Sequence, residues 1–197
     1  MSALSLSTAS APLASRDEQA LLSRAIAGVL RHAQDGDLPL FAWTLGLPQP
    51  TLLAMLAQCF PELDRLEPMP EPDYASVRAA TPAGFAELVA LLGRHRSSGV
   101  AEDRADWLAR AVAAACFGER SLWEDLGLSG RDALSRLMEH YFPPLSRRNP
   151  ARRSWKPFLF AELAAARAAS EVPGDGAGPD DRPGFSDADS KRTVAKP

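Results

Sequence analysis

The sequence predicts an all-α protein, and two patterns support this prediction. In several stretches of about ten to twenty residues, apolar side chains recur every three or four positions, so that they lie on one face of a helix. No stretch alternates apolar and polar residues for long enough to form a half-buried strand. Glycines and prolines stand where the periodic stretches begin or end. We therefore expect a small bundle of about six to seven helices.

The first predicted helix follows a start rich in serine and alanine, residues 1–14, which we expect to be disordered. Ser15 can cap this helix, because Glu18 three residues later completes a capping box. Apolar residues then recur at helical spacing as far as Leu30, and Gly36 ends the helix.

Two further helices are predicted on either side of a Leu-Gly-Leu turn. Asp37 can cap a short helix over Leu38–Leu45, which Gly46 ends. A longer helix spans about Pro48–Cys59, and the Phe-Pro pair at 60–61 breaks it.

The middle of the chain is predicted to hold a connection and two helices. Residues 62–81 contain several prolines and little periodicity, so we expect an extended surface connection. Thr81 then caps a helix that has Pro82 in its first turn and ends near Arg94. The most apolar helix spans about Glu102–Cys116.

A weak internal repeat links the two halves of the predicted bundle. The sequence Trp-Thr-Leu-Gly-Leu at 43–47, followed by a helix and Phe-Pro at 60–61, returns as Trp-Glu-Asp-Leu-Gly-Leu at 123–128, a helix, and Phe-Pro at 142–143. We expect two similar helical hairpins on one core, because glycine allows the backbone to turn sharply at the same place in each. The tryptophans predicted to be buried are Trp43 and Trp123, at equivalent places, and Trp107, between helices.

A basic segment without acidic residues lies between Glu139 and Glu162. In one interpretation it is a solvated edge, with Trp155 docked into the core. In the other it binds an anion or an acidic partner, because the planar donor groups of arginine suit oxyanions such as phosphate, carboxylate or molybdate. The cations of this segment are Arg147, Arg148, Arg152, Arg153 and Lys156.

The composition fits one globular domain with loose ends. Of the 197 residues, 46% are hydrophobic and 24% charged, which is enough to build a core. The last amphipathic helix can extend to Ser170, so we expect a helical domain over residues 15–170. The remainder, residues 171–197, is rich in glycine, proline, aspartate and serine and is predicted to be disordered.

Charge and hydropathy limit the possible partners and the location. The net charge of −3 provides no bulk attraction to nucleic acid or to a membrane. There is no apolar run of about 18 residues, as a transmembrane helix would need. Residues 1–15 have neither a basic start nor a long apolar region, so we expect no secretory signal and a cytoplasmic protein. A helix-turn-helix around Leu128–Tyr141 suggests DNA binding only weakly, because its few arginines are balanced by acids.

The candidate reactive residues do not form a recognisable catalytic or metal site. Cys59 and Cys116 lie in apolar helical patterns and are predicted to be buried thiols, and two thiols cannot form a four-thiolate cluster site. The histidines lie on three different helices without a shared spacing; they are His32, His95 and His140. Neither a nucleophile elbow nor a glycine-rich phosphate loop is present. We expect no catalytic residue, no metal ligand set, and a protein that is not an enzyme.

Several sequence blocks, in this order, resemble the NifQ family of nitrogen-fixation proteins. They are LPLFAWTLGLP at 38–48, CFPE at 59–62, WLARAVAAACFG at 107–118, SLWEDLGL at 121–128, HYFPPLSRRN at 140–149 and SWKPF at 154–158. The resemblance covers about Ala20–Leu163. It implies a role in supplying molybdenum for the iron–molybdenum cofactor of nitrogenase, a molybdenum–iron–sulfur cluster, and partners among the cofactor-assembly proteins.

The chain departs from the family pattern after this region. In the family, the Trp-Lys-aromatic segment leads into a C-x4-C-x2-C-x5-C cluster that another cysteine precedes. Here Ala164 occupies the place of that cysteine, and no cysteine follows it. We therefore expect molybdenum handling for cofactor assembly without the usual thiolate ligands. The alternative is a cysteine-less, NifQ-like helical protein-interaction module that holds no metal cluster.

Removing residues 171–197 is predicted to leave the helical core intact, because this segment has too few apolar residues to offset its ordering entropy. A chain that ends at Ser170 should melt within about 2 °C of the full chain in a thermal unfolding experiment. A fall of several degrees would instead mean that part of the segment docks onto the core.

Overall fold

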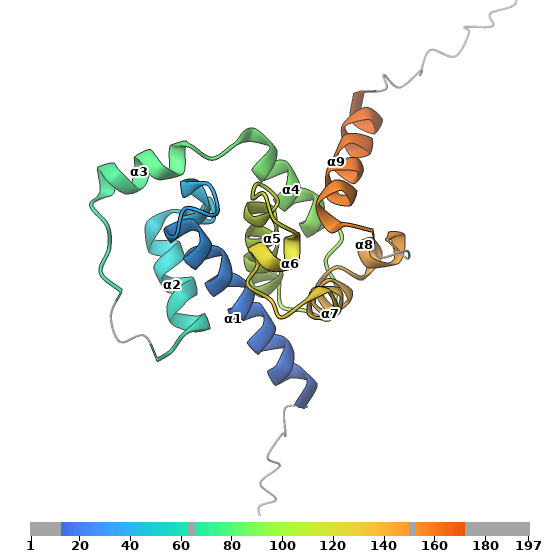
Figure 1. Ribbon diagram of the computed structural model, residues 1–197, viewed down its shortest axis with the longest axis horizontal. Coiled ribbons are helices and arrows are strands. Elements are labelled where there is room, and N and C mark those ends of the chain that lie inside the picture. Colours follow the sequence, from blue (N-terminus) through green and yellow to red (C-terminus); the bar gives the residue numbers. More distant parts are fainter. Residues whose placement is uncertain (1–12, 63–65, 150–152, 172–197) are drawn as a thin grey trace, which may run out of the picture.

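The computed structural model describes residues 13–62, 66–149 and 153–171, and within these ranges every regular element is a helix (Figure 1). The predicted all-α fold is confirmed. Seven of the described helices have nine or more residues, in agreement with the expected number. The elements are α1 (Leu13–Gln34), the 3-10 helix η1 (Leu40–Thr44), α2 (Gln49–Cys59), α3 (Glu71–Ala79), α4 (Ala83–Arg94), α5 (Glu102–Ala115), α6 (Leu122–Asp125), α7 (Arg131–Tyr141), α8 (Pro143–Arg148) and α9 (Trp155–Glu171).

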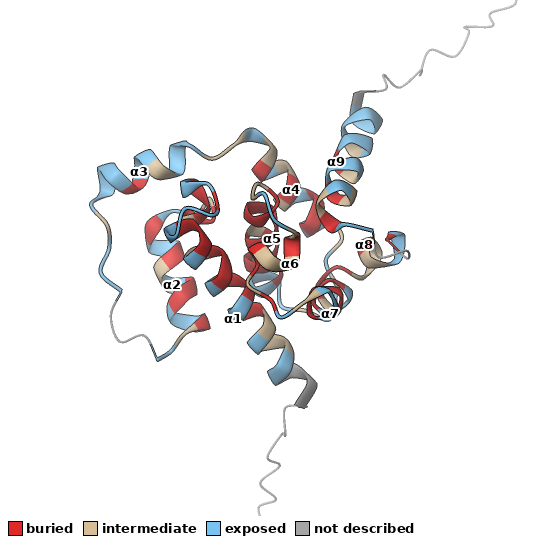
Figure 2. Ribbon diagram, viewed as in Figure 1, coloured by how far each residue is buried: buried red, intermediate tan, exposed pale blue. Residues whose placement is uncertain are grey.

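Helix α5 is the centre of the core. It packs against both α1 and α4, and nine of its 14 residues are buried (Figure 2). Six of these nine are alanines, whose small side chains allow the neighbouring helices to approach closely. Trp107 is 9% exposed, so its predicted burial is confirmed.

The backbone of α1 comes very close to the turn after α6. A Cβ atom added to Gly28 would overlap the carbonyl group of Leu126 and lie 2.8 Å from the backbone nitrogen of Gly127. Gly127 has a φ of +62°, in the left-handed region that favours glycine. Two glycines, one on each element, therefore permit this contact.

The internal repeat is present in the backbone. Helices α2 and α7 both have 11 residues and both follow a Leu-Gly-Leu turn with a left-handed glycine, Gly46 in the first copy and Gly127 in the second. Both helices end at a phenylalanine of similar conformation, with φ −138° and ψ 69° at Phe60 and φ −131° and ψ 58° at Phe142. The short helix before the turn differs, because η1 is a 3-10 helix and α6 is a single α-helical turn.

The tryptophans of the repeat are less buried than predicted. Trp43 and Trp123 are half-buried and pack against the edge of the core. A helix of one turn can bury only one side, and in both copies the residues facing inward are others, including the leucine before the turn glycine, Leu45 or Leu126. The prediction that Trp43 and Trp123 are core residues was therefore wrong, although the turn itself was predicted correctly.

The expected extended connection over residues 62–81 contains helix α3, so that prediction was also wrong. Tyr74 is buried and donates a hydrogen bond from its hydroxyl group to the carbonyl oxygen of Leu47, at 2.8 Å. The side chain of Gln49 donates to the carbonyl oxygen of Met69, also at 2.8 Å. These bonds hold the segment against the first repeat. The prolines near its start begin the helix instead of breaking it, because proline is well tolerated in a first turn.

Two helix starts differ from the predicted positions. Thr81 does not cap α4, because its hydroxyl group donates to the carbonyl oxygen of Arg78 at the end of α3, and Pro82 is the N-cap of α4. Helix α1 begins at Leu13, before the predicted cap. The predicted disordered ends lie outside the described residues except for the first residues of α1 and the last residue of α9. Within the described ranges no single helix is long and apolar enough to cross a membrane; α3 and α4 reach that limit only as a pair bent by 80°.

Replacing Gly28 by alanine should destabilise the protein by about 2–3 kcal/mol, because the new methyl group has to displace backbone atoms and not a flexible side chain. Chemical denaturation monitored by circular dichroism gives this free energy of unfolding. Gly93→Ala in α4 is the matched control, since an added Cβ there meets nothing within 4 Å. The control should leave stability unchanged or raise it by up to about 1 kcal/mol. Equal effects of the two substitutions would contradict the close approach of α1 to the turn.

Candidate functional site

The predicted basic segment contains a buried lysine. Lys156, in the first turn of α9, donates hydrogen bonds from Nζ to the carbonyl oxygen of Gly118, at 2.8 Å, and to the carboxylate of Asp125. The side chain of Asp125 is fully buried and that of Lys156 is 13% exposed. A Cβ atom on Gly118 would lie 2.8 Å from the carboxyl carbon of Asp125, so glycine makes room for this ion pair. Lys156 therefore joins α9 to α6.

Arg120 extends this ion pair to the end of α1. Its Nε donates to Asp125 Oδ1 at 3.2 Å, and its Nη2 donates to Asp37 Oδ2 at 2.9 Å. The same Asp37 oxygen lies 3.1 Å from Nδ1 of His32. We call these five residues the Asp125 network: His32, Asp37, Arg120, Asp125 and Lys156. Its members come from three separate parts of the chain: the end of α1 and the loop after it, the segment around α6, and the start of α9.

The other predicted cations divide into paired and unpaired side chains. Arg148 forms an ion pair with Glu162 at 2.7 Å, and its Nη2 also lies 2.9 Å from Nε2 of His95. Arg147 and Arg153 are exposed, and their guanidinium groups have no bonding partner among the described residues. Arg152 lies outside the described residues. The segment is thus not one continuous basic face, and anion binding by its members stays a prediction.

Asn149 closes the loop before α9. It is 4% exposed, its Oδ1 accepts a hydrogen bond from the backbone N–H of Arg153 at 3.0 Å, and its Nδ2 donates to the carbonyl oxygen of Arg153 at 3.1 Å. Trp155 is buried, as one of the two interpretations of the segment predicted. The guanidinium-bearing side chain of Arg153 lines a pocket of about 360 Å³, opposite residues of α6 and α7. Arg131, which the sequence suggested only as part of a weak DNA-binding motif, lines the same pocket.

Both cysteines are buried and free. Burial raises the pKa of the Cys59 thiol to about 11 and that of the Cys116 thiol to about 12, so both are protonated near neutral pH. Thiolates, and not thiols, bind metals. The two cysteines supply at most half of the four thiolates that an iron–sulfur cluster requires.

The histidines lie apart and each has a local partner. His32 belongs to the Asp125 network, Nδ1 of His95 lies 2.8 Å from the carbonyl oxygen of Leu91, and Nδ1 of His140 lies 2.9 Å from Glu18. Across the described ranges no group of three or more His, Cys, Asp or Glu residues is arranged to hold a metal ion. The described residues thus do not fit a molybdenum–iron–sulfur cluster.

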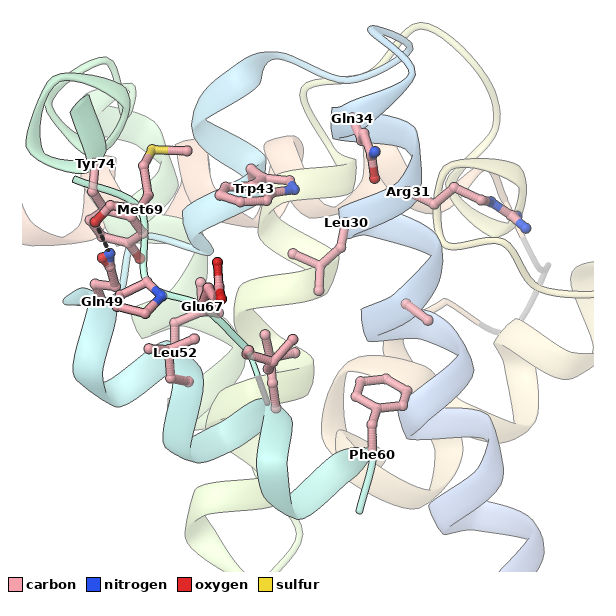
Figure 3. Close-up of a pocket in the computed structure, with 15 residues that line it drawn as sticks. Leu30, Arg31, Gln34, Trp43, Gln49, Leu52, Phe60, Glu67, Met69 and Tyr74 are labelled. Carbon is pink, nitrogen blue, oxygen red and sulfur yellow. Dashed lines mark hydrogen bonds between the residues drawn. The ribbon is translucent and has the colours of Figure 1, made fainter. Parts of the chain in front are cut away.

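An apolar pocket of about 440 Å³ lies between α1, η1, α2 and the residues before α3 (Figure 3). Leu30, Trp43, Leu52 and Phe60 point toward it, which explains why Trp43 is only half-buried. The charged residues in its lining are one cation, Arg31, and one anion, Glu67. The lining offers apolar contact area, and its described residues include no serine, cysteine, lysine or histidine.

These observations define a class: a small all-α domain whose C-terminal helix is fastened by a buried ion-pair network and whose described residues contain no catalytic constellation. Comparison with known proteins identifies it further. The sequence model of the NifQ family, described as "NifQ", matches residues 25–171, which is well over half of the chain. The chain therefore belongs to the NifQ family. Membership supports an accessory role in nitrogen fixation.

Two curated relatives agree with this assignment. "Protein NifQ" of Azotobacter vinelandii is 47% identical over 57 residues, which are 29% of this chain and 29% of the relative. "Protein NifQ" of Rhodobacter capsulatus is 33% identical over 110 residues, which are 56% of this chain and 54% of the relative. The matched part thus spans at most about half the length of either relative. No solved structure shows a significant match to the chain.

Replacing Asp125 by asparagine should destabilise the fold by about 3–5 kcal/mol, because it leaves the buried ammonium group of Lys156 without a counter-charge. The control is Asp106→Asn, which removes the partly exposed ion pair with Arg110 one helical turn away and should cost less than about 1 kcal/mol. Urea denaturation of both variants measures the difference. In Asp125→Asn/Lys156→Met, part of the loss should be recovered, since no buried charge is left unpaired. A cost of Asp125→Asn no larger than that of the control would show that the network does not stabilise the fold.

Proposed function

We propose that this protein acts in the cytoplasm as an accessory protein that supplies molybdenum for assembly of the iron–molybdenum cofactor of nitrogenase. The observation that carries the proposal is the match of the NifQ family over residues 25–171. Its partners in this role are other cofactor-assembly proteins. The protein binds and transfers its cargo and catalyses no reaction of its own.

The chemistry of the donor groups defines how molybdenum is handled. Iron–sulfur and molybdenum–iron–sulfur clusters need soft thiolate ligands. The two thiols lie at the ends of different helices, α2 and α5, and would have to leave apolar packing to reach a cluster. We therefore propose that the cargo reaches this domain either as an oxyanion or on a partner that itself provides the thiolates.

A second candidate function is that of a protein-interaction module without metal. The burial of both thiols and the absence, within the described ranges, of a three-ligand group favour it. In this case the helical domain binds the same assembly proteins but carries no cargo. The two functions differ in whether molybdenum accompanies the purified protein.

Anaerobic purification followed by iron and molybdenum analysis tests the proposal. The expected result is molybdenum without stoichiometric iron, which a high-salt wash removes, because exposed charges are screened over about 8–10 Å near physiological ionic strength. Arg152→Ala/Arg153→Ala should lower the retained molybdenum, whereas Arg24→Ala, an exposed arginine on α1, should not.

Two other results would change the conclusion. Stoichiometric iron with a sulfur-to-iron charge-transfer band that survives the wash would contradict the absence of a thiolate-bound cluster. Co-purification with assembly proteins, but without molybdenum at any ionic strength, would favour the interaction module.

A further inference from the structure

Three helices begin at the walls of the pocket that Arg153 lines. Ser121 and Trp123 come from the start of α6, Arg131 and Ser135 from the first turns of α7, and Ser154 and Trp155 from the start of α9. Figure 1 shows α6, α7 and the beginning of α9 in the same part of the molecule. We call this cavity the arginine pocket.

The helix starts give the pocket a positive electrostatic character. The first turn of a helix has backbone N–H groups without intrahelical partners and carries about half a positive charge. The N-cap residue of α7, Gly130, has no side chain that could accept hydrogen bonds from the N–H groups of the first turn. Helix α6 has only four residues and its start is closed by the capping box of Ser121 and Glu124, so it provides a wall and not a charge.

The lining side chains add to this charge. Arg131 and Arg153 are both exposed to the pocket, and within the described part of the chain neither guanidinium group has a hydrogen bond or ion pair. The acidic lining residue, Asp132, is already engaged in an interaction of its own. Two cations against one carboxylate leave a net charge of +1 on the lining side chains. The nearby Glu124 has a lowered pKa, chiefly because Ser121 donates hydrogen bonds to it and in smaller part because of Arg120 and Arg131.

Ser135 supplies an independent indication that something binds here. It is 7% exposed, it lines the pocket, and no described residue forms a hydrogen bond with its hydroxyl group. Among the described residues, every side-chain polar atom that is sealed from solvent has a hydrogen-bond partner. Since the hydroxyl group of Ser135 has none, it is open to the pocket that the residue lines. The residue is thus largely buried while its hydroxyl group has no protein partner within the described ranges, so this hydroxyl group is available to a ligand in the pocket. Ser135 lies one helical turn after Arg131 and therefore on the same face of α7.

We infer that the arginine pocket binds a tetrahedral oxyanion, the class of ion that includes molybdate, sulfate and phosphate. Two guanidinium groups offer planar pairs of donors, and the hydroxyl group of Ser135 and the first-turn N–H groups of α7 offer single donors from other directions. Donors spread in this way match four oxygens better than the two oxygens of a carboxylate. The site itself follows from the geometry, and only its assignment to molybdate rests on the proposed function.

Isothermal titration of the full chain with sodium molybdate, sodium sulfate and sodium phosphate at low ionic strength tests the site. Arg131→Gln, Arg153→Gln and Ser135→Ala should each weaken the binding about tenfold, as expected for the loss of one charge-assisted hydrogen bond. Arg136→Gln is the matched control, since Arg136 is an exposed arginine on the same helix as Arg131 but does not line the pocket. Its affinity should stay within about twofold of the unmodified chain, and circular dichroism should show the same helix content in all variants.

The three anions distinguish the site from its assignment. The oxyanion site and its assignment to molybdate would both be supported if molybdate binds at least about tenfold tighter than sulfate and phosphate and the pocket variants lose this binding. Equal binding of all three, or a preference for phosphate, would support the oxyanion site and overturn its assignment to molybdate. No saturable binding of any anion, or binding that Arg131→Gln and Ser135→Ala leave unchanged, would overturn the site. Such a result would not affect the proposed function, which the metal analysis of the purified protein tests independently.

Discussion

The buried carboxylate of Asp125 is the interaction on which the arrangement of the C-terminal half depends. It lies on α6, a helix of four residues that has no stability of its own, since isolated helices need about 12–15 residues even to be marginal. Two cations from different parts of the chain, Arg120 and Lys156, neutralise it. A buried charge without such partners would cost several kcal/mol. The position of α9 is therefore fixed by a contact with α6, and the sequence of α9 alone does not determine it. Residue 118 has to be glycine, because a side chain there would overlap the Asp125 carboxylate.

The Asp125 network also decides which cations remain available for binding. Lys156 is used inside the protein, and Arg148 is neutralised by Glu162 on α9. The unpaired guanidinium groups of the described part of the basic segment are then Arg147, on the surface, and Arg153, at the pocket. Of the four described cations in this run, two are paired inside the protein and two have free guanidinium groups. Whether a cation is paired or free depends on whether its side chain reaches a carboxylate in the fold, and the charge pattern of the sequence does not show this.

The sequence predicted well what depends on local signals. The long helices follow from apolar periodicity, and the two Leu-Gly-Leu turns follow from glycine at positive φ. Helix α3 was missed because Tyr74 is its only buried residue, which is too weak a pattern beside several prolines. The pairing of Asp125 with Lys156, 31 residues apart, has no local signal. One clue was present: a lysine between a tryptophan and Pro-Phe, in an apolar stretch, suggests a charge that needs a buried partner.

The two copies of the repeat differ at the residue before the turn, and this difference bears on the pocket. In the first copy the residue before the Leu-Gly-Leu turn is Thr44, fully buried, whose hydroxyl group donates to the carbonyl oxygen of Phe41 at 2.8 Å. In the second copy the corresponding residue is Asp125, which has to find its partners farther away. The two partners fix α6 and the start of α9 in space, and these two elements form walls of the arginine pocket. The position of Arg153 relative to Arg131 therefore depends on a buried ion pair that does not itself line the pocket, so the oxyanion site and the stability of the C-terminal half share one cause.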